Sequence, residues 1–280
     1  MLPVLLNLGF IKIYTFGVFL VLGFFWAAFL LWKNIRLTSF KEEDVFDGLF
    51  LSLFGALFFG RLIYVIINFK DFGFNLLKFI LINGYPGISL YGLVFGGLLV
   101  LYLFSNVKKI NFNELIDYFV TPLFIALVFG KVGAFLSGVE IGTKTNFLLK
   151  IKYTGFDGFR HLVGLYEGLI LIIGALIAYK ILFEIRKEKY YKGFLIKFFI
   201  WFLALTIFLF DKIKDNRLYF FGQSLDFLVS SIILLTTSLY FVYYFRNGIL
   251  GSIKNYGQKI FKTVHTRTKK KIGRGKEKKP

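Results

Sequence analysis

Residues 11–32 read I-K-I-Y-T-F-G-V-F-L-V-L-G-F-F-W-A-A-F-L-L-W, a run in which Lys12 is the only charged side chain. A helix needs about 20 mostly apolar residues to cross the hydrocarbon core of a bilayer, and this run is long enough. It lies close to the N-terminus, yet the residues before it lack the basic stretch and cleavage site of a signal peptide. We therefore expect it to stay in the membrane as a spanning helix.

The composition of the whole chain extends this interpretation. Its 280 residues are 57% hydrophobic and include 39 phenylalanines, which is more apolar surface than a soluble domain of this length can bury. We predict an all-α, polytopic membrane protein with about seven transmembrane helices. The expected spans are residues 11–32, 47–68, 87–105, 116–137, 162–183, 194–210 and 223–245.

Lysine and arginine residues set the expected orientation, because short loops rich in them stay in the cytoplasm. One side of the membrane would hold the basic loops near residues 33–41, 108–109 and 186–192, together with the C-terminal end. The sequence thus predicts the N-terminus outside and the C-terminus inside. We expect residues 1–246 to form one helical bundle, and residues 247–280 to form a basic, disordered cytoplasmic tail that binds anionic membrane lipids.

The residue types also exclude several kinds of site. There is no cysteine, so the chain supplies neither a disulfide nor a thiol nucleophile. His161 and His265 are the only histidines, which is too few for a zinc site, and we expect neither a metal nor a cofactor. The net charge of +19 comes without any recognition motif for DNA or RNA, so we expect no nucleic-acid partner.

Polar residues at membrane depth are the first candidates for function, because an ionisable side chain there costs about 2.5–3.5 kcal/mol and needs a partner or a purpose. They are Arg61, Tyr91, Lys131, Glu140, Glu167 and Asp226. Structural roles stay open for several of them. Arg61 and Lys131 can extend to an interface, as long basic side chains do. Tyr91 can be a core residue, and Asp226 can cap a helix.

Small residues recur every four positions in the fourth span, a spacing that lets two membrane helices approach closely. They are Gly130, Ala134, Gly138 and Gly142, and Gly92 and Gly96 repeat the spacing in the third span. We expect these residues to lie at helix contacts.

Lys131 and Glu140 are nine residues apart, about 900° of helical rotation, so a continuous helix would point them to opposite sides. They can share a site only if the helix breaks near Ser137 and Gly138. Convergent cations in a lipid-lined cavity would suit a phosphodiester headgroup, and a carboxylate or tyrosine beside them would handle a proton. That combination describes either an enzyme acting on phospholipid or a carrier of an anionic amphiphile.

Five motifs resemble those of a known family, the prolipoprotein diacylglyceryl transferases. Residues 130–142, G-K-V-G-A-F-L-S-G-V-E-I-G, are similar to the family signature G-R-x-G-N-F-x-N-x-E-x-x-G. Residues 160–167, R-H-L-V-G-L-Y-E, resemble R-H-P-x-Q-L-Y-E, and residues 91–96, Y-G-L-V-F-G, resemble H-G-G-L-I-G. Residues 60–65, G-R-L-I-Y-V, resemble G-R-x-x-Y-V, and residues 222–223 match the Gly-Gln before the family's last helix.

The resemblance implies a multi-pass enzyme of the bacterial cytoplasmic membrane. Its reaction moves diacylglyceryl from phosphatidylglycerol to the lipobox cysteine thiol in the signal peptide of a prolipoprotein. Lys131 stands where the family has the arginine that binds the phosphatidylglycerol headgroup. The resemblance also implies substrate-binding roles for Arg61, His161, Tyr166 and Glu167.

This sequence departs from the family pattern at several positions. A tyrosine, Tyr91, replaces the family histidine and is a poor base at neutral pH, while a lysine at 131 lacks the bidentate fork of arginine. The other replaced positions are Ala134 and Ser137 (asparagines in the family), Val139 (the signature glutamate, with Glu140 one place later), and Ala204 and Phe208 (an arginine and a glutamate).

Three interpretations stay open. In the first, the chain is an active transferase whose catalytic residue is Glu140 or Tyr91, or whose acid–base work is done by a water. In the second, it is a catalytically impaired member that binds phospholipid or lipoprotein precursors. In the third, it is a small membrane transporter, although no pair of broken spans supports that interpretation.

Overall fold

A computed structural model describes residues 2–9, 12–81, 84–85, 87–215, 219–220 and 222–246. Within this part of the chain, seven helices are long and apolar enough to cross a membrane, which confirms the predicted all-α, seven-span fold. They are α1 (Thr15–Ile35), α2 (Glu42–Ile67), α5 (Leu90–Val107), α6 (Phe112–Ser137), α7 (Val163–Arg186), α8 (Phe194–Phe210) and a last helix at Leu225–Arg246. The tail at 247–280 lies outside the described residues.

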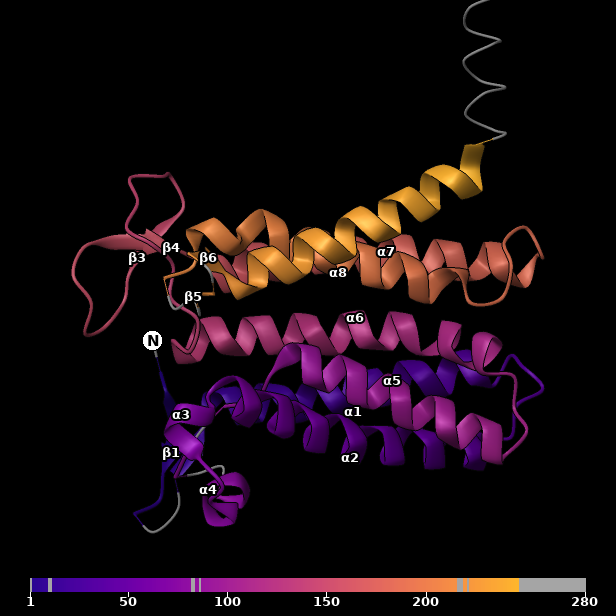
Figure 1. Cartoon of the computed structure of the whole chain (residues 1–280), viewed down its shortest axis with the longest axis horizontal. Helices are drawn as coiled ribbons and strands as arrows, with labels where there is room; N and C mark the ends of the chain where they lie inside the picture. Colours follow the sequence, from indigo (N-terminus) through magenta and orange to yellow (C-terminus); the bar gives the residue numbers. More distant parts are fainter. Residues whose placement is uncertain are drawn as a thin grey trace, which may run out of the picture.

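Short elements connect these helices and gather at one end of the bundle (Figure 1). Two short helices, α3 (Phe69–Phe72) and α4 (Leu76–Ile80), lie between α2 and α5, and a 3-10 turn, η1 (Asp211–Ile213), follows α8. Three antiparallel hairpins complete the fold: β1 (Val4–Asn7) with β2 (Lys12–Tyr14), β3 (Lys150–Lys152) with β4 (Phe159–His161), and β5 (Tyr219–Phe220) with β6 (Gln223–Ser224).

Helix α6 lies in the middle of the molecule, between the group of α1, α2 and α5 and the group of α7, α8 and the last helix (Figure 1). Its side chains Leu115 and Phe124 are fully buried, and they share one apolar core with Leu171 of α7 and Phe199 of α8. Apolar side chains elsewhere point outward, as lipid-facing positions require. The central helix is therefore the element best placed to carry a protected site.

Glycines set the contact between α2 and α5. A Cβ added at Gly92 would lie 2.5 Å from the carbonyl oxygen of Phe59, and one at Gly96 would lie 2.6 Å from that of Gly55. No side chain fits in such gaps, so the two backbones approach as closely as small residues allow. The predicted packing role of Gly92 and Gly96 is confirmed.

The same prediction is wrong for Gly138 and Gly142, because α6 ends at Ser137 and both residues follow it. The tight glycine of α6 is instead Gly133, where a Cβ would lie 2.6 Å from Cβ of Phe19 on α1. Gly130 has room for a side chain, since the nearest atom to its added Cβ is 3.8 Å away.

Candidate functional site

The end of α6 brings Lys131 and Glu140 together. Gly138 adopts a left-handed conformation with φ +76°, and the Gly138 and Val139 N–H groups donate to the carbonyls of Phe135 and Ala134. This is a Schellman cap, which stops the helix and turns the chain back over its last turn. The Lys131 ammonium then lies 2.5 Å from Oε1 of Glu140. The helix break that the sequence required at this point is confirmed.

Glu167, in the first turns of α7, lies on the other side of the same lysine. Its Oε2 is 2.5 Å from the Lys131 ammonium, and its side chain is 1% exposed. Helices α6 and α7 approach closely here because Gly164 has no side chain, and a Cβ there would lie 2.7 Å from the carbonyl oxygen of Lys131. The buried carboxylate thus has a fixed position against α6.

Lys214 completes the group, and sequence reasoning missed it. Its ammonium is 2.7 Å from Oε1 of Glu167. We call Lys131, Glu140, Glu167 and Lys214 the ion-pair cluster. Its four formal charges, two positive and two negative, balance within a largely buried space.

Lys214 reaches the cluster because the chain folds back after α8. The Thr143 N–H donates to the carbonyl of Ile213, and the Asp215 N–H donates to that of Ile141, so the two loops pair side by side. Ala204 in α8 is buried and carries no charge, as the sequence comparison with the family indicated. The second positive charge of the cluster comes instead from Lys214, in the segment D-K-I-K-D at residues 211–215, which follows the apolar span. This run of charged residues was the only feature of the sequence that could have indicated Lys214 as a site residue.

Glu140 lies beyond the end of α6, and its surroundings shift the pKa of its carboxyl. Burial alone would raise the pKa of its carboxyl, but the charges of Lys131 and then Lys214 outweigh burial and lower it. The carboxylate is therefore ionised and firmly paired in this arrangement. A carboxylate held in this way is a weak proton acceptor.

Tyr91 and Asp226 form a second contact near the cluster. The Tyr91 hydroxyl donates to Oδ1 of Asp226 at 3.0 Å. Asp226 is not the cap of the last helix, because Ser224 accepts from the Phe227 N–H in that role. The contact joins α5 to the last helix, and the structure gives no direct contact between Tyr91 and Glu140 within the described residues.

Arg160 and His161 lie on β4 and contact the loop that follows α6. Arg160 donates to the carbonyl of Gly142 at 3.0 Å and pairs with Asp215 at 2.5 Å. The ring centroid of His161 lies 6.1 Å from that of Tyr166, whose hydroxyl donates to the carbonyl of Leu149. Among the described residues, buried Nδ1 of His161 has no hydrogen-bond partner. The contacts of these side chains are made with residues outside the ion-pair cluster.

Arg61 occupies a different place. It is 2% exposed and donates to the carbonyl oxygens of Lys78 at 2.7 Å, Gly87 at 2.8 Å and Phe79 at 2.9 Å. These contacts tie α2 to the segment containing α4. Contact between Arg61 and a headgroup shared with Lys131 stays a prediction.

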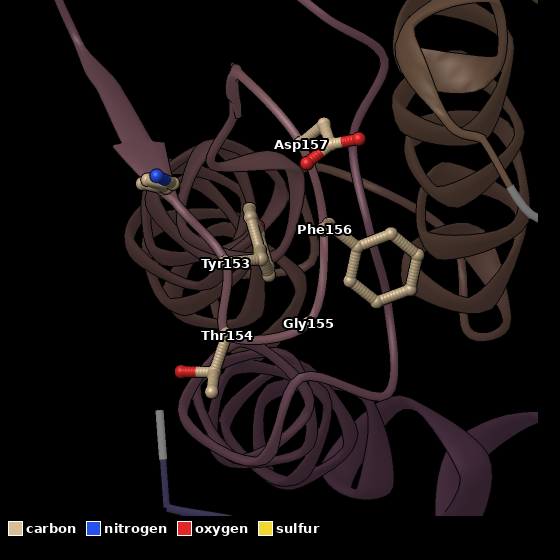
Figure 2. A pocket seen from close by; sticks show the side chains of 6 residues that line it. Tyr153, Thr154, Gly155, Phe156 and Asp157 are labelled. Carbon is tan, nitrogen blue, oxygen red and sulfur yellow. The ribbon is translucent and has the colours of Figure 1, made fainter.

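The loop between β3 and β4 curls around a surface hollow of about 490 Å³, lined by residues 152–157 (Figure 2). No member of the ion-pair cluster lines it. Tyr153 connects the two regions, since its hydroxyl donates to the carbonyl of His161 at 3.1 Å. Burial, with Tyr166 and Glu140 nearby, raises the pKa of Tyr153 to about 12. Within the described residues, no three metal-ligating side chains converge.

Comparisons with known proteins agree on one family. The family described as prolipoprotein diacylglyceryl transferase matches residues 3–244. A phosphatidylglycerol–prolipoprotein diacylglyceryl transferase of Clostridium tetani is 30% identical over 154 residues, which cover 55% of this chain and 61% of the relative, less than two thirds of its length. Relatives of the same name are 26% identical in Clostridioides difficile (74% of this chain, 81% of the relative) and 25% identical in Clostridium kluyveri (86% and 96%).

Proposed function

This chain belongs to the prolipoprotein diacylglyceryl transferase family, and we propose that it transfers diacylglyceryl from phosphatidylglycerol to the lipobox cysteine thiol of a prolipoprotein. We propose the bacterial cytoplasmic membrane as the place of this reaction, because the part of the chain that the structure describes has seven helices able to span a bilayer and the relatives named above are bacterial. The prolipoprotein signal peptide would supply the reacting thiol, since the chain itself has no cysteine.

The buried ammonium of Lys131 is the observation that carries this proposal. By the resemblance of residues 130–142 to the family signature, it takes the place of the signature arginine, and it lies in the central helix α6, paired with both Glu140 and Glu167. A phosphodiester in a low-dielectric space needs a fixed positive charge, and Lys131 supplies one with three N–H donors. Lys214 supports the same role, because it holds Glu167 and adds a second positive charge.

The proposed reaction breaks an S–H bond and a C–O bond and forms a C–S bond. The thiol loses its proton, and its sulfur bonds to the glycerol carbon that carries the phosphate. The bond from that carbon to the phosphate oxygen breaks, and its electron pair leaves with glycerol phosphate. Lys131 would stabilise the charge that grows on the departing phosphate, while Glu140, the more exposed of the two carboxylates on Lys131, would accept the thiol proton.

Transfer of labelled diacylglyceryl from phosphatidylglycerol to a lipobox peptide tests the proposal. We expect wild type to be active and Lys131→Ala to lose at least about 100-fold in rate, because a charge-assisted contact to the leaving phosphate is gone. Lys131→Arg should keep measurable transfer, since it keeps the charge. The matched control is Lys152→Ala, an exposed lysine on β3, which should transfer like wild type.

A catalytically impaired lipid binder is the second candidate function. It is favoured by the resting arrangement, in which Lys131 pairs with both Glu140 and Glu167 and the Tyr91 hydroxyl is held by Asp226. Wild type that binds phosphatidylglycerol but transfers nothing to the lipobox peptide would support this alternative and refute the transferase.

A further inference from the structure

The ion-pair cluster is electrically complete before any substrate arrives. Lys131 and Lys214 are balanced by Glu140 and Glu167, so the four formal charges sum to zero. A phosphodiester brings one more negative charge. At low dielectric an uncompensated charge is strongly disfavoured, so an anion can bind Lys131 well only if a carboxylate leaves it.

The two carboxylates on Lys131 are not equally held. Glu167 is 1% exposed, lies on a helix and pairs with two lysines, whereas the Glu140 side chain is 24% exposed and, among the described residues, pairs directly with Lys131 alone. Glu140 also follows the left-handed Gly138, on a loop rather than a helix. Among the described residues, only Oε1 of Glu140 pairs with a lysine, whereas each oxygen of Glu167 lies against one. Glu140 is therefore the carboxylate that an incoming anion displaces more easily.

We propose that Glu140 is a displaceable counter-ion: the phosphate of phosphatidylglycerol takes its place on Lys131, and the released carboxylate then accepts the proton of the acceptor thiol. This inference rests on the proposed transferase function. Lipid binding and base activation become one event, because the contact that holds Glu140 as a weak base is the contact that the phosphate removes.

The thiol gives its proton to Glu140, its sulfur forms the thioether bond, and glycerol phosphate leaves with the electron pair of the broken carbon–oxygen bond. The leaving phosphate then takes the proton from Glu140 or exchanges it with water. The regenerated carboxylate returns to Lys131, which helps to release the product. Before the lipid binds, the lysines lower the pKa of Glu140, and after displacement burial acts in the opposite direction.

Glu140→Gln separates the two parts of this mechanism, because the amide has the same shape but neither competes as an anion nor accepts the proton. We expect its dissociation constant for phosphatidylglycerol, carried in phosphatidylcholine nanodiscs, to fall about 3- to 10-fold. Its kcat for transfer to the lipobox peptide should fall by at least about 100-fold, the usual contribution of a general base. Lower kcat with tighter binding is the expected signature. A structural role alone would weaken binding as well.

Two further variants keep the test decisive. Glu140→Asp keeps the charge, so it should bind the lipid like wild type while its shorter side chain slows transfer. Asp157→Asn removes a carboxylate from the exposed β3–β4 loop and should change neither quantity. Lipid binding by Glu140→Gln that is equal to or weaker than that of wild type would overturn the displacement. Transfer by this variant at the wild-type kcat would overturn the base role.

The binding measurement also separates this inference from the proposed function. Failure of wild type to transfer at all refutes the transferase and, with it, the base role of Glu140. Displacement is still decided by lipid affinity alone in that case, because tighter binding by Glu140→Gln supports it and unchanged affinity refutes it.

Discussion

A single glycine determines whether Lys131 and Glu140 meet. Gly138 has φ +76°, a conformation that costs a residue with a side chain roughly 1–2 kcal/mol. The cap that it forms ends α6 at Ser137, less than two turns after Lys131. The residues that follow then run back toward the Lys131 ammonium. The backbone conformation of this one residue thus allows two side chains nine positions apart in the sequence to form an ion pair.

The ion pair of Glu140 should appear in the pH dependence of stability. Its folded-state pKa is lowered from an ordinary value of 4.5, so the pair stabilises the fold fully above that pH, and the stabilisation is lost as pH falls through the lower folded-state value. We expect the unfolding midpoint of wild type in detergent to exceed that of Glu140→Gln at pH 7, and the difference to shrink below about pH 4.5.

The Asp157→Asn variant again provides the control, because Asp157 lies on the exposed loop and other carboxylates titrate equally in both proteins. Its unfolding midpoint should stay close to that of wild type. A difference between wild type and Glu140→Gln that is constant from pH 7 to pH 3 would contradict the pairing of Glu140 with Lys131 and Lys214.

At the scale of elements, α2 and α5 should be sensitive to any added side chain at their contact. Gly96→Ala places a Cβ 2.6 Å from the carbonyl oxygen of Gly55 and 2.5 Å from Cβ of Phe59. Relieving these contacts would require the backbone of α2 or α5 to move. We expect a loss of about 1–3 kcal/mol in stability, the usual range for overpacking. Thermal unfolding in detergent measures it.

The neighbouring glycine supplies a matched control. A Cβ at Gly97 meets Ala56 Cβ at 3.5 Å, an ordinary contact, and alanine is the better helix former. Gly97→Ala should therefore unfold at the same temperature as wild type or slightly above it. Equal effects of the two substitutions would show that the glycines of α5 act through helix propensity and not through helix contact.

The helices and the loops between them also show which features could be predicted from the sequence and which could not. The spans were predictable because hydropathy is local, and the break after Ser137 was predictable because two charges needed it. Lys214 was not, since its partner Glu167 lies far away in sequence and only the fold-back after α8 brings them together. Asp117 shows the same limit. It is fully buried and accepts from the N–H groups at the start of α8, a cap that comes from another helix.

At the scale of the whole molecule, the two ends of the bundle carry different kinds of connecting segments. One end carries the hairpins, α3, α4 and the end of α6 with the ion-pair cluster, and the other carries the short loops 36–41, 108–111 and 187–193 (Figure 1). Basic residues are frequent in these short loops. The positive-inside rule therefore predicts that the end with the cluster faces away from the cytoplasm, where a translocated acceptor peptide would arrive.

The absence of cysteine from the chain makes that orientation directly measurable, because each introduced thiol is the only one present. Ser39→Cys lies in the exposed loop between α1 and α2, and Thr154→Cys lies in the exposed loop between β3 and β4. With the N-terminus outside and the C-terminus inside, a membrane-impermeant maleimide should label Thr154→Cys in intact cells and Ser39→Cys only after the membrane is opened. The cysteine-free parent gives the background, and both variants should keep transfer activity, since neither residue contacts the cluster. The opposite labelling pattern would reverse the predicted topology and would place the ion-pair cluster on the cytoplasmic side, away from any acceptor thiol that has crossed the membrane.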